Sequence, residues 1–236
     1  MADNVNINQQ ELLKKLKAIG GDLWGLTGGQ LAGNPAEEGK TAEESREAKG
    51  KPAGKKPANI PVKKEKDSLE SLWFKVDETI DWTDALAHAF PSDGLTPQNL
   101  WDFYRSQAEK VLQGDLNAYR EVLKRTNPLG ELTAYADGLS MRVPDADRAE
   151  AIFTCNHDLL QKKGKRYLSA MGVRIARDLM ACLPVCEAGV TAYDQGEEVM
   201  RVTYTREQLM HKNLRFFDPV AVTEACGAEF GEAVGS

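Results

Sequence analysis

Apolar residues recur with helical spacing near the start of the chain. Their spacing places them on one face of a helix, and two glycines that would end the helix follow. The four positions are Leu12, Leu13, Leu16 and Ile19. A further apolar residue, Trp24, comes soon after, in a glycine-rich stretch. The pattern predicts a short amphipathic helix within residues 1–27.

The apolar pattern disappears in residues 28–67. This stretch has no aromatic residue and almost no large aliphatic residue, and Gly, Pro, Ala, Lys and Glu dominate it. Such a composition buries too little apolar surface to offset the entropy of an ordered chain. We therefore expect a disordered basic linker that tethers the N-terminal helix and holds it away from the core.

Helical periodicity returns in residues 68–136, where aromatic residues are frequent. Thr96 and Pro97 have the pattern of an N-cap followed by proline at the first helical position, and an apolar stripe over residues 98–112 predicts the helix that they open. Asp115 is placed to cap a second helix over residues 116–125. We expect a small helical unit with aromatic packing.

The last part of the chain, residues 137–236, mixes two periodicities. Two short β-type runs precede a long helical segment over about residues 158–183, and two alternating runs around a turn then predict a β-hairpin. Two short helices follow, so the order is ββ-α-ββ-αα. We expect an α+β fold in which one long helix crosses an antiparallel or mixed sheet. The predicted parts are residues 1–27, 28–67, 68–136 and 137–236.

Composition and charge narrow the class of protein. The chain has 236 residues, 42% of them hydrophobic, and a net charge of −6, which excludes a collagen-like or wholly disordered chain. The charge is segregated, because residues 1–66 carry +3 and residues 67–236 carry −9. No apolar run approaches the ~18 residues of a membrane span, and no signal-peptide pattern opens the sequence. Four cysteines in such a chain indicate reduced thiols, so we expect a cytoplasmic protein.

Three aspartates and a histidine form one candidate metal site. Asp77, Asp81, Asp84 and His88 fall within an arc of about 60° if they share one helix. Carboxylates and an imidazole on one face are the ligands that a divalent metal needs. A metal-dependent enzyme is therefore one hypothesis. The preferred alternative is that Asp81 or Thr83 caps a helix beginning at Trp82, which would disperse the stripe.

Cysteine and histidine residues suggest two further sites. Cys155, His157, Cys182 and Cys186 could supply four ligands to zinc, but their spacing differs from the paired knuckles of structural zinc sites. Cys155 and His157 could also form a nucleophile and its base, although the sequence shows no third group to orient them. Buried, inert thiols are the preferred interpretation.

Basic residues gather on the long predicted helix. At helical pitch four of them fall within about 80° of arc, and the flexible segment upstream is also basic. They are Lys163, Arg166, Arg174 and Arg177. This face predicts a weak contact with nucleic acid or another polyanion.

The N-terminal helix offers a different class of function. Its apolar edge has no core beside it in the predicted arrangement, and lysines flank that edge at positions 14, 15 and 17. An amphipathic helix on a tether is typical of peptides that dock into a groove of a partner. We therefore expect a non-catalytic adaptor that binds a protein partner through residues 8–24 and needs no cofactor. The metal-dependent enzyme is the alternative.

Overall fold

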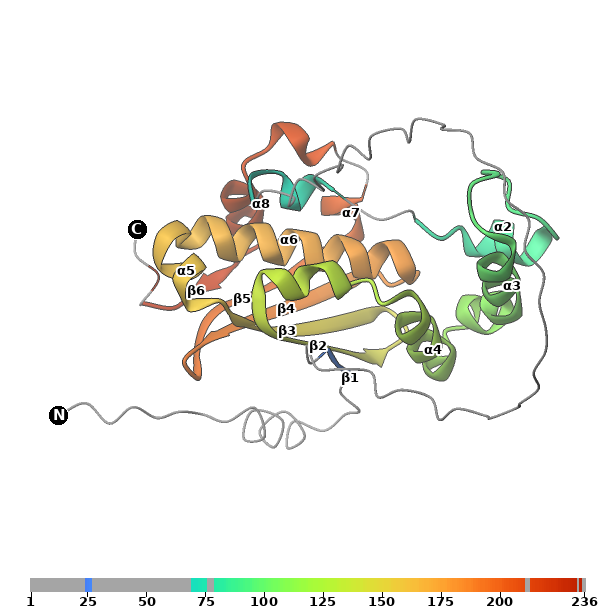
Figure 1. The fold of residues 1–236 in the computed structure, drawn as a ribbon, viewed down its shortest axis with the longest axis horizontal. Helices are drawn as coiled ribbons and strands as arrows, with labels where there is room; N and C mark the ends of the chain where they lie inside the picture. The colour runs from blue at the N-terminus through green and yellow to red at the C-terminus, as the bar shows by residue number, and fades with distance from the viewer. Residues whose placement is uncertain (1–23, 27–68, 76–78, 211–212, 233, 235–236) are drawn as a thin grey trace, which may run out of the picture. The chain divides into compact units, whose positions relative to one another are not determined.

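The computed structural model describes residues 24–26, 69–75, 79–210, 213–232 and 234 (Figure 1). The predicted N-terminal helix and the predicted linker over residues 28–67 therefore lie outside the described residues, as does Asp77. Trp24, from the predicted docking set, lies within them.

Six strands of the described chain form one sheet, in the order β1-β2-β3-β4-β5-β6. Neighbours run antiparallel except β3 and β4, which run parallel. Their bounds are Trp24–Leu26 for β1, Ala136–Asp145 for β2, Arg148–Cys155 for β3, Glu187–Asp194 for β4, Glu197–Thr205 for β5 and Glu229–Phe230 for β6. The α+β class and the mixed sheet are confirmed.

Three residues of the N-terminal region belong to this sheet. Trp24 lies opposite Met141 and Leu26 opposite Leu139, so β1 pairs with the outer edge of β2. The sequence predicted that the linker holds the region before residue 28 away from the core. The pairing corrects that expectation, because it anchors the chain on the sheet just after the amphipathic pattern.

The helices follow the predicted order. They are η1 (Leu69–Phe74), α2 (Trp82–Ala87), α3 (Gln98–Leu112), α4 (Leu116–Thr126), η2 (Gly130–Ala134), α5 (His157–Lys163), α6 (Lys165–Cys182), α7 (Arg206–Leu209), η3 (Leu214–Phe216) and α8 (Pro219–Ala225). Asp115 caps α4 as predicted, since its side chain accepts from the backbone N–H groups of Asn117 and Ala118. None of the helices described is long and apolar enough to cross a membrane.

The long predicted helix is broken at Gly164. This residue has φ +49° and separates α5 from α6. A positive φ of this kind is disfavoured for residues with a Cβ, and glycine adopts it without steric cost. The prediction of one continuous helix over residues 158–183 was therefore wrong at this point. Together α5 and α6 form the crossover that the parallel pair β3 and β4 requires.

Helix α6 is buried along almost its whole length. It packs on β4 and β5, and η1 and α8 contact it as well (Figure 1). The approach to the sheet is close at Gly172, where a Cβ would lie 2.7 Å from the Tyr204 hydroxyl. The short elements therefore form a second layer that covers the helix from the side away from the sheet.

The segment of α2 and α3 is attached to the end of α6. The Trp82 indole N–H donates to the Cys182 carbonyl at 3.0 Å, and the Ile80 N–H donates to the Ala181 carbonyl at 2.9 Å. The buried core is continuous from these helices to the sheet. A domain boundary at residue 136 stays a prediction.

Candidate functional site

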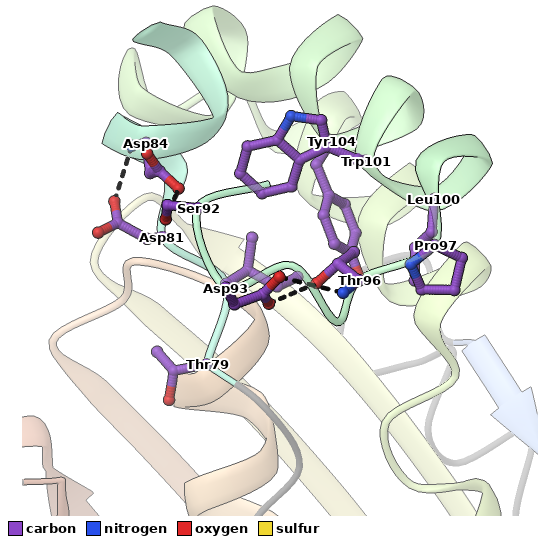
Figure 2. Close-up of a pocket in the computed structure, with 11 residues that line it drawn as sticks. Thr79, Asp81, Asp84, Ser92, Asp93, Thr96, Pro97, Leu100, Trp101 and Tyr104 are labelled. Carbon is purple, nitrogen blue, oxygen red and sulfur yellow. Dashed lines mark hydrogen bonds between the residues drawn. The ribbon is translucent and has the colours of Figure 1, made fainter. Parts of the chain in front are cut away.

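A cavity of about 170 Å³ lies between α2, the loop after it and the first turns of α3 (Figure 2). Three aspartates line it together with Ser92, Thr96 and an aromatic wall. We call the segment of α2, the loop after it and α3 the arm, and this cavity the arm pocket. The residues that matter to its chemistry are Asp81, Asp84, Asp93, Trp101 and Tyr104.

Asp81 is the N-cap of α2. Its Oδ1 accepts from the backbone N–H groups of Thr83 at 3.0 Å and Asp84 at 2.9 Å. The helix therefore begins at Trp82, as the alternative interpretation of the sequence proposed. Within the described part of the chain, the second carboxylate oxygen of Asp81 accepts no hydrogen bond.

Asp84 bridges the helix and the loop. Its Oδ2 accepts from the Ser92 hydroxyl at 2.5 Å, and its Oδ1 lies 2.5 Å from Nδ1 of His88. The Ser92 hydrogen bond, with smaller contributions from His88, lowers the pKa of Asp84. Because the carboxylate stands between Ser92 and His88, the serine proton points to the aspartate. The three residues therefore lack the order of a Ser-His-Asp nucleophile.

Asp93 organises the loop that opens α3. Its Oδ1 accepts from the N–H groups of Leu95 at 2.8 Å and Thr96 at 3.1 Å, and its Oδ2 accepts from the Thr96 hydroxyl at 2.7 Å. These bonds, the Thr96 N–H first, lower the pKa of Asp93. The prediction that Thr96 caps α3 was wrong. Pro97 occupies the cap position, and the threonine hydroxyl is used within the loop.

The wall of the arm pocket is aromatic and held in place. Trp101 and Tyr104 are buried, and the Trp101 indole N–H donates to the His88 carbonyl at 3.3 Å. Tyr104 packs edge-to-face on Trp82 with ring centroids 5.6 Å apart. Since Trp82 is itself bonded to the end of α6, this wall is part of the core.

Exposed large apolar side chains lie close in sequence to residues that line the arm pocket. Leu86 is 51% exposed, Phe90 72% and Leu95 75%, and all three lie between the last turn of α2 and the start of α3. From Thr79 to Tyr104 the chain has four aspartates and no lysine or arginine. We call Leu86, Phe90 and Leu95 the apolar rim. The sequence analysis missed it, although apolar residues beside the turn-forming Pro91, Ser92, Asp93 and Gly94 were a signal.

The candidate metal ligands are not brought together as predicted. Asp81 caps the helix, and Asp84 and His88 bond to each other, so the described members do not share one free face. Among the residues that the structure describes, no group of three or more His, Cys, Asp or Glu side chains could hold a metal ion. Asp77 is not among them.

The candidate zinc ligands lie at opposite ends of the sheet. Cys155 is the last residue of β3, and Cys186 precedes β4. The parallel register pairs Arg148 with Glu187, so Cys186 lies beside the start of β3. At ~3.3 Å per residue the two cysteines are about 23 Å apart along the strand. They cannot ligate one ion.

The structure places an orienting group, Asp194, beside His157, which the sequence did not show. Its Nδ1 lies 2.9 Å from Oδ2 of Asp194, at the end of the neighbouring strand. The thiol of Cys155, however, is buried, and burial, with Asp194 and Asp137, raises its pKa to about 12. The thiolate is the nucleophilic form, so this environment disfavours a Cys–His nucleophile.

Alkylation of the cysteines tests this environment. We expect iodoacetamide at pH 8 to modify the exposed Cys186 first and to leave the buried Cys155 and Cys182 unmodified until the protein unfolds. Burial keeps the Cys155 thiol protonated at that pH, and the protonated thiol reacts poorly. Mass spectrometry of the peptides gives the order, and the denatured protein serves as control. Faster labelling of Cys155 than of Cys186 would contradict the burial of the Cys155 thiol.

Two of the four basic residues on the long helix make their contacts inside the protein. Arg174 is buried and bonds to the buried Asp178 at 2.7 Å. Arg177 donates to the Trp73 carbonyl at 3.3 Å, and burial lowers its pKa. Arg174 therefore pairs within its own helix, Arg177 joins α6 to η1, and both present little surface to a polyanion.

The other two basic residues lie nearer the surface and have acidic partners. Lys163 Nζ is 3.4 Å from Glu70 Oε1, and Arg166 Nη1 is 3.2 Å from Asp218 Oδ1. The Arg166 guanidinium also lies over the Trp73 ring, 5.1 Å from its centroid. The contact with a polyanion stays a prediction, and Lys163 and Arg166 are its surface members.

The predicted docking residues Leu12, Leu13, Leu16 and Ile19 lie outside the described residues. No protein-family model matches the chain, and neither a curated protein nor a solved structure shows a significant match.

Proposed function

We propose that this chain is a non-catalytic cytoplasmic interaction protein that docks a protein partner. The apolar rim carries the proposal. Leu86, Phe90 and Leu95 are more than half exposed and lie within ten residues of one another, Leu86 at the end of α2 and the other two in the loop after it. A cluster of large apolar side chains at the surface is typical of an interaction site. Aromatic side chains, phenylalanine among them, are enriched at protein interfaces.

The surroundings of the rim favour docking over catalysis. The carboxylates of Asp84 and Asp93 are engaged by the loop itself, and Asp81 caps α2. Their hydrogen bonds fix the shape of the arm pocket. A rigid, acidic and apolar surface of this kind offers complementarity to a partner with little ordering cost.

The N-terminal segment, residues 8–24, is the second docking element of the proposal. Its support is the amphipathic pattern of the sequence. Since β1 begins at Trp24, the segment ends on the edge of the sheet. A weaker contact of Lys163 and Arg166 with a polyanion belongs to the same proposal.

The compartment is also part of the proposal. The four cysteines, all in the described part of the chain, are reduced thiols, which suits a reducing compartment.

Capture of a partner from the native lysate tests the proposal. We expect Phe90→Ser with Leu95→Ser to lower the recovery of the captured partner at least about tenfold, because burying each side chain stabilises a complex by about 1.5–3 kcal/mol. Deletion of residues 1–23, which ends before β1, should lower it too. Quantitative mass spectrometry of the bound fraction gives the recovery.

The matched control is Phe216→Ser, because Phe216 is 81% exposed on a different element, η3. It should leave the recovery unchanged. The serine variants should keep the melting temperature of the parent, since Phe90, Leu95 and Phe216 are at least half exposed. Equal recovery with the parent and the Phe90 and Leu95 variant would overturn the proposal.

A further inference from the structure

We propose that the arm pocket and the apolar rim bind the amphipathic segment, residues 8–19, of a second copy of the chain. This inference rests on the proposed function and names its partner. Two copies that exchange this segment reciprocally would form a closed dimer.

Charge complementarity is the first argument. Three aspartates, Asp81, Asp84 and Asp93, line the arm pocket, and its lining residues include no lysine or arginine. Residues 8–19 have three lysines and one glutamate, and Leu12, Leu13, Leu16 and Ile19 interleave with the lysines. An acidic surface with an apolar rim thus faces a basic segment with an apolar edge, and opposite charges of this kind steer association and set its register.

The size of the arm pocket is the second argument. Its volume of about 170 Å³ is below the roughly 300–1,000 Å³ of pockets that hold small-molecule ligands. It has room for one long side chain. A lysine from the segment fits its chemistry, because the aliphatic stem packs on the aromatic wall while the ammonium meets a carboxylate. Asp81 offers the acceptor, since its Oδ2 accepts no hydrogen bond from the described residues.

The path of the chain favours a second copy over the same chain. Residue 19 is five residues before β1 and Lys14 is five residues further, so with residues 8–19 helical, as their pattern predicts, the lysines reach at most ~26 Å from Trp24. The arm pocket lies at the first turns of α3, and that helix of 15 residues is about 22 Å long. Its other end meets the turn between β2 and β3, where a Cβ on Gly114 would lie 2.8 Å from Ala146.

The strand adds to this separation. Trp24 pairs with Met141, five residues before Ala146, so β1 is about 17 Å from that turn along β2. Figure 1 shows α2 and α3 beyond the end of the sheet and β1 beside its middle. The segment of a second copy has no such limit of reach.

Light scattering coupled to gel filtration tests the inference on the full chain. We expect a dimer that dissociates more readily at high salt, because the contact is partly ionic. Two full-chain variants should weaken dimerisation at least about tenfold. One carries Lys14→Glu, Lys15→Glu and Lys17→Glu, and the other carries Phe90→Ser and Leu95→Ser.

The charge-matched control carries Lys55→Glu, Lys56→Glu and Lys63→Glu. It changes the net charge by the same amount outside the segment, and it should remain dimeric. Phe216→Ser should also remain dimeric. An equal loss of the dimer in the control variant would show a general charge effect and overturn the inference.

Mixing the two weakened variants is the decisive measurement. Each supplies what the other lacks, so one intact contact should form and a mixed dimer should appear. A wild-type chain that stays monomeric at all concentrations would overturn the inference. This holds also if the segment binds the arm pocket of its own chain. The proposed function would still stand if partner capture remained sensitive to Phe90→Ser with Leu95→Ser.

Discussion

Replacing Asp178 with leucine is expected to lower the free energy of unfolding by about 3–5 kcal/mol. Asp178 is 0% exposed and Arg174 is 3% exposed, and their side chains bond at 2.7 Å one turn apart in α6. Loss of the carboxylate removes the acidic partner that a buried guanidinium has one turn away on the same helix. Breaking one side of a buried ion pair is the physical reason for the large effect.

The double variant Arg174→Met with Asp178→Leu separates the charge from the packing. We expect it to recover most of the lost stability, because apolar side chains of similar volume need no counter-charge. Urea unfolding followed by tryptophan fluorescence measures all variants. Arg201→Met is the control, since its pair with Glu198 is exposed and its loss should cost less than about 1 kcal/mol. A double variant as unstable as Asp178→Leu would contradict this account.

Replacing Arg206 with methionine is the second change for which we expect a large loss in the free energy of unfolding. Its guanidinium donates to three backbone carbonyls at the end of α6, those of Met180 and Leu183 at 2.6 Å and that of Val185 at 2.9 Å. Half-burial lowers the pKa of Arg206. Without the side chain these carbonyls lose charge-assisted bonds where water has limited access, and we expect a loss of about 3 kcal/mol.

Lysine at the same position should recover only part of this stability. It carries the charge but cannot direct several N–H groups at fixed angles as the planar guanidinium does. Hydrogen exchange should show the loss of protection first in the last turn of α6 and the start of β4. Arg105→Met, on the exposed face of α3, is the control. The Arg105→Met variant should keep its protection. A loss of protection spread uniformly over the Arg206→Met variant would argue against a local role for Arg206.

Much of the fold follows from local patterns. Periodicity and caps predicted α3, α4, the β4–β5 hairpin and the order of the elements, because spacing along the chain decides which face of an element is apolar. Asp115 illustrates this, since its cap depends only on the next residues. Gly164 shows the limit, because the glycine could have continued the helix or ended it.

The candidate site was less accessible to the sequence. The sequence left the cap of α2 open between Asp81 and Thr83, and neither the exposure of Phe90 and Leu95 nor the burial of Trp101 follows from composition. Which aromatic residue faces solvent depends on where the α2–α3 segment attaches, and the hydrogen bond from Trp82 to the end of α6 decides that.

The basic face of α6 shows most clearly what only the tertiary structure decided. The sequence by itself placed four basic residues on one side of a helix and predicted a surface. Elements distant along the chain supply Glu70, Trp73 and Asp218 as partners for Lys163, Arg177 and Arg166. The fourth residue, Arg174, is buried and pairs with Asp178 of its own helix. Local spacing determines the elements and their faces. Burial, ion pairing and the attachment of β1 depend on residues that meet only when the chain has folded.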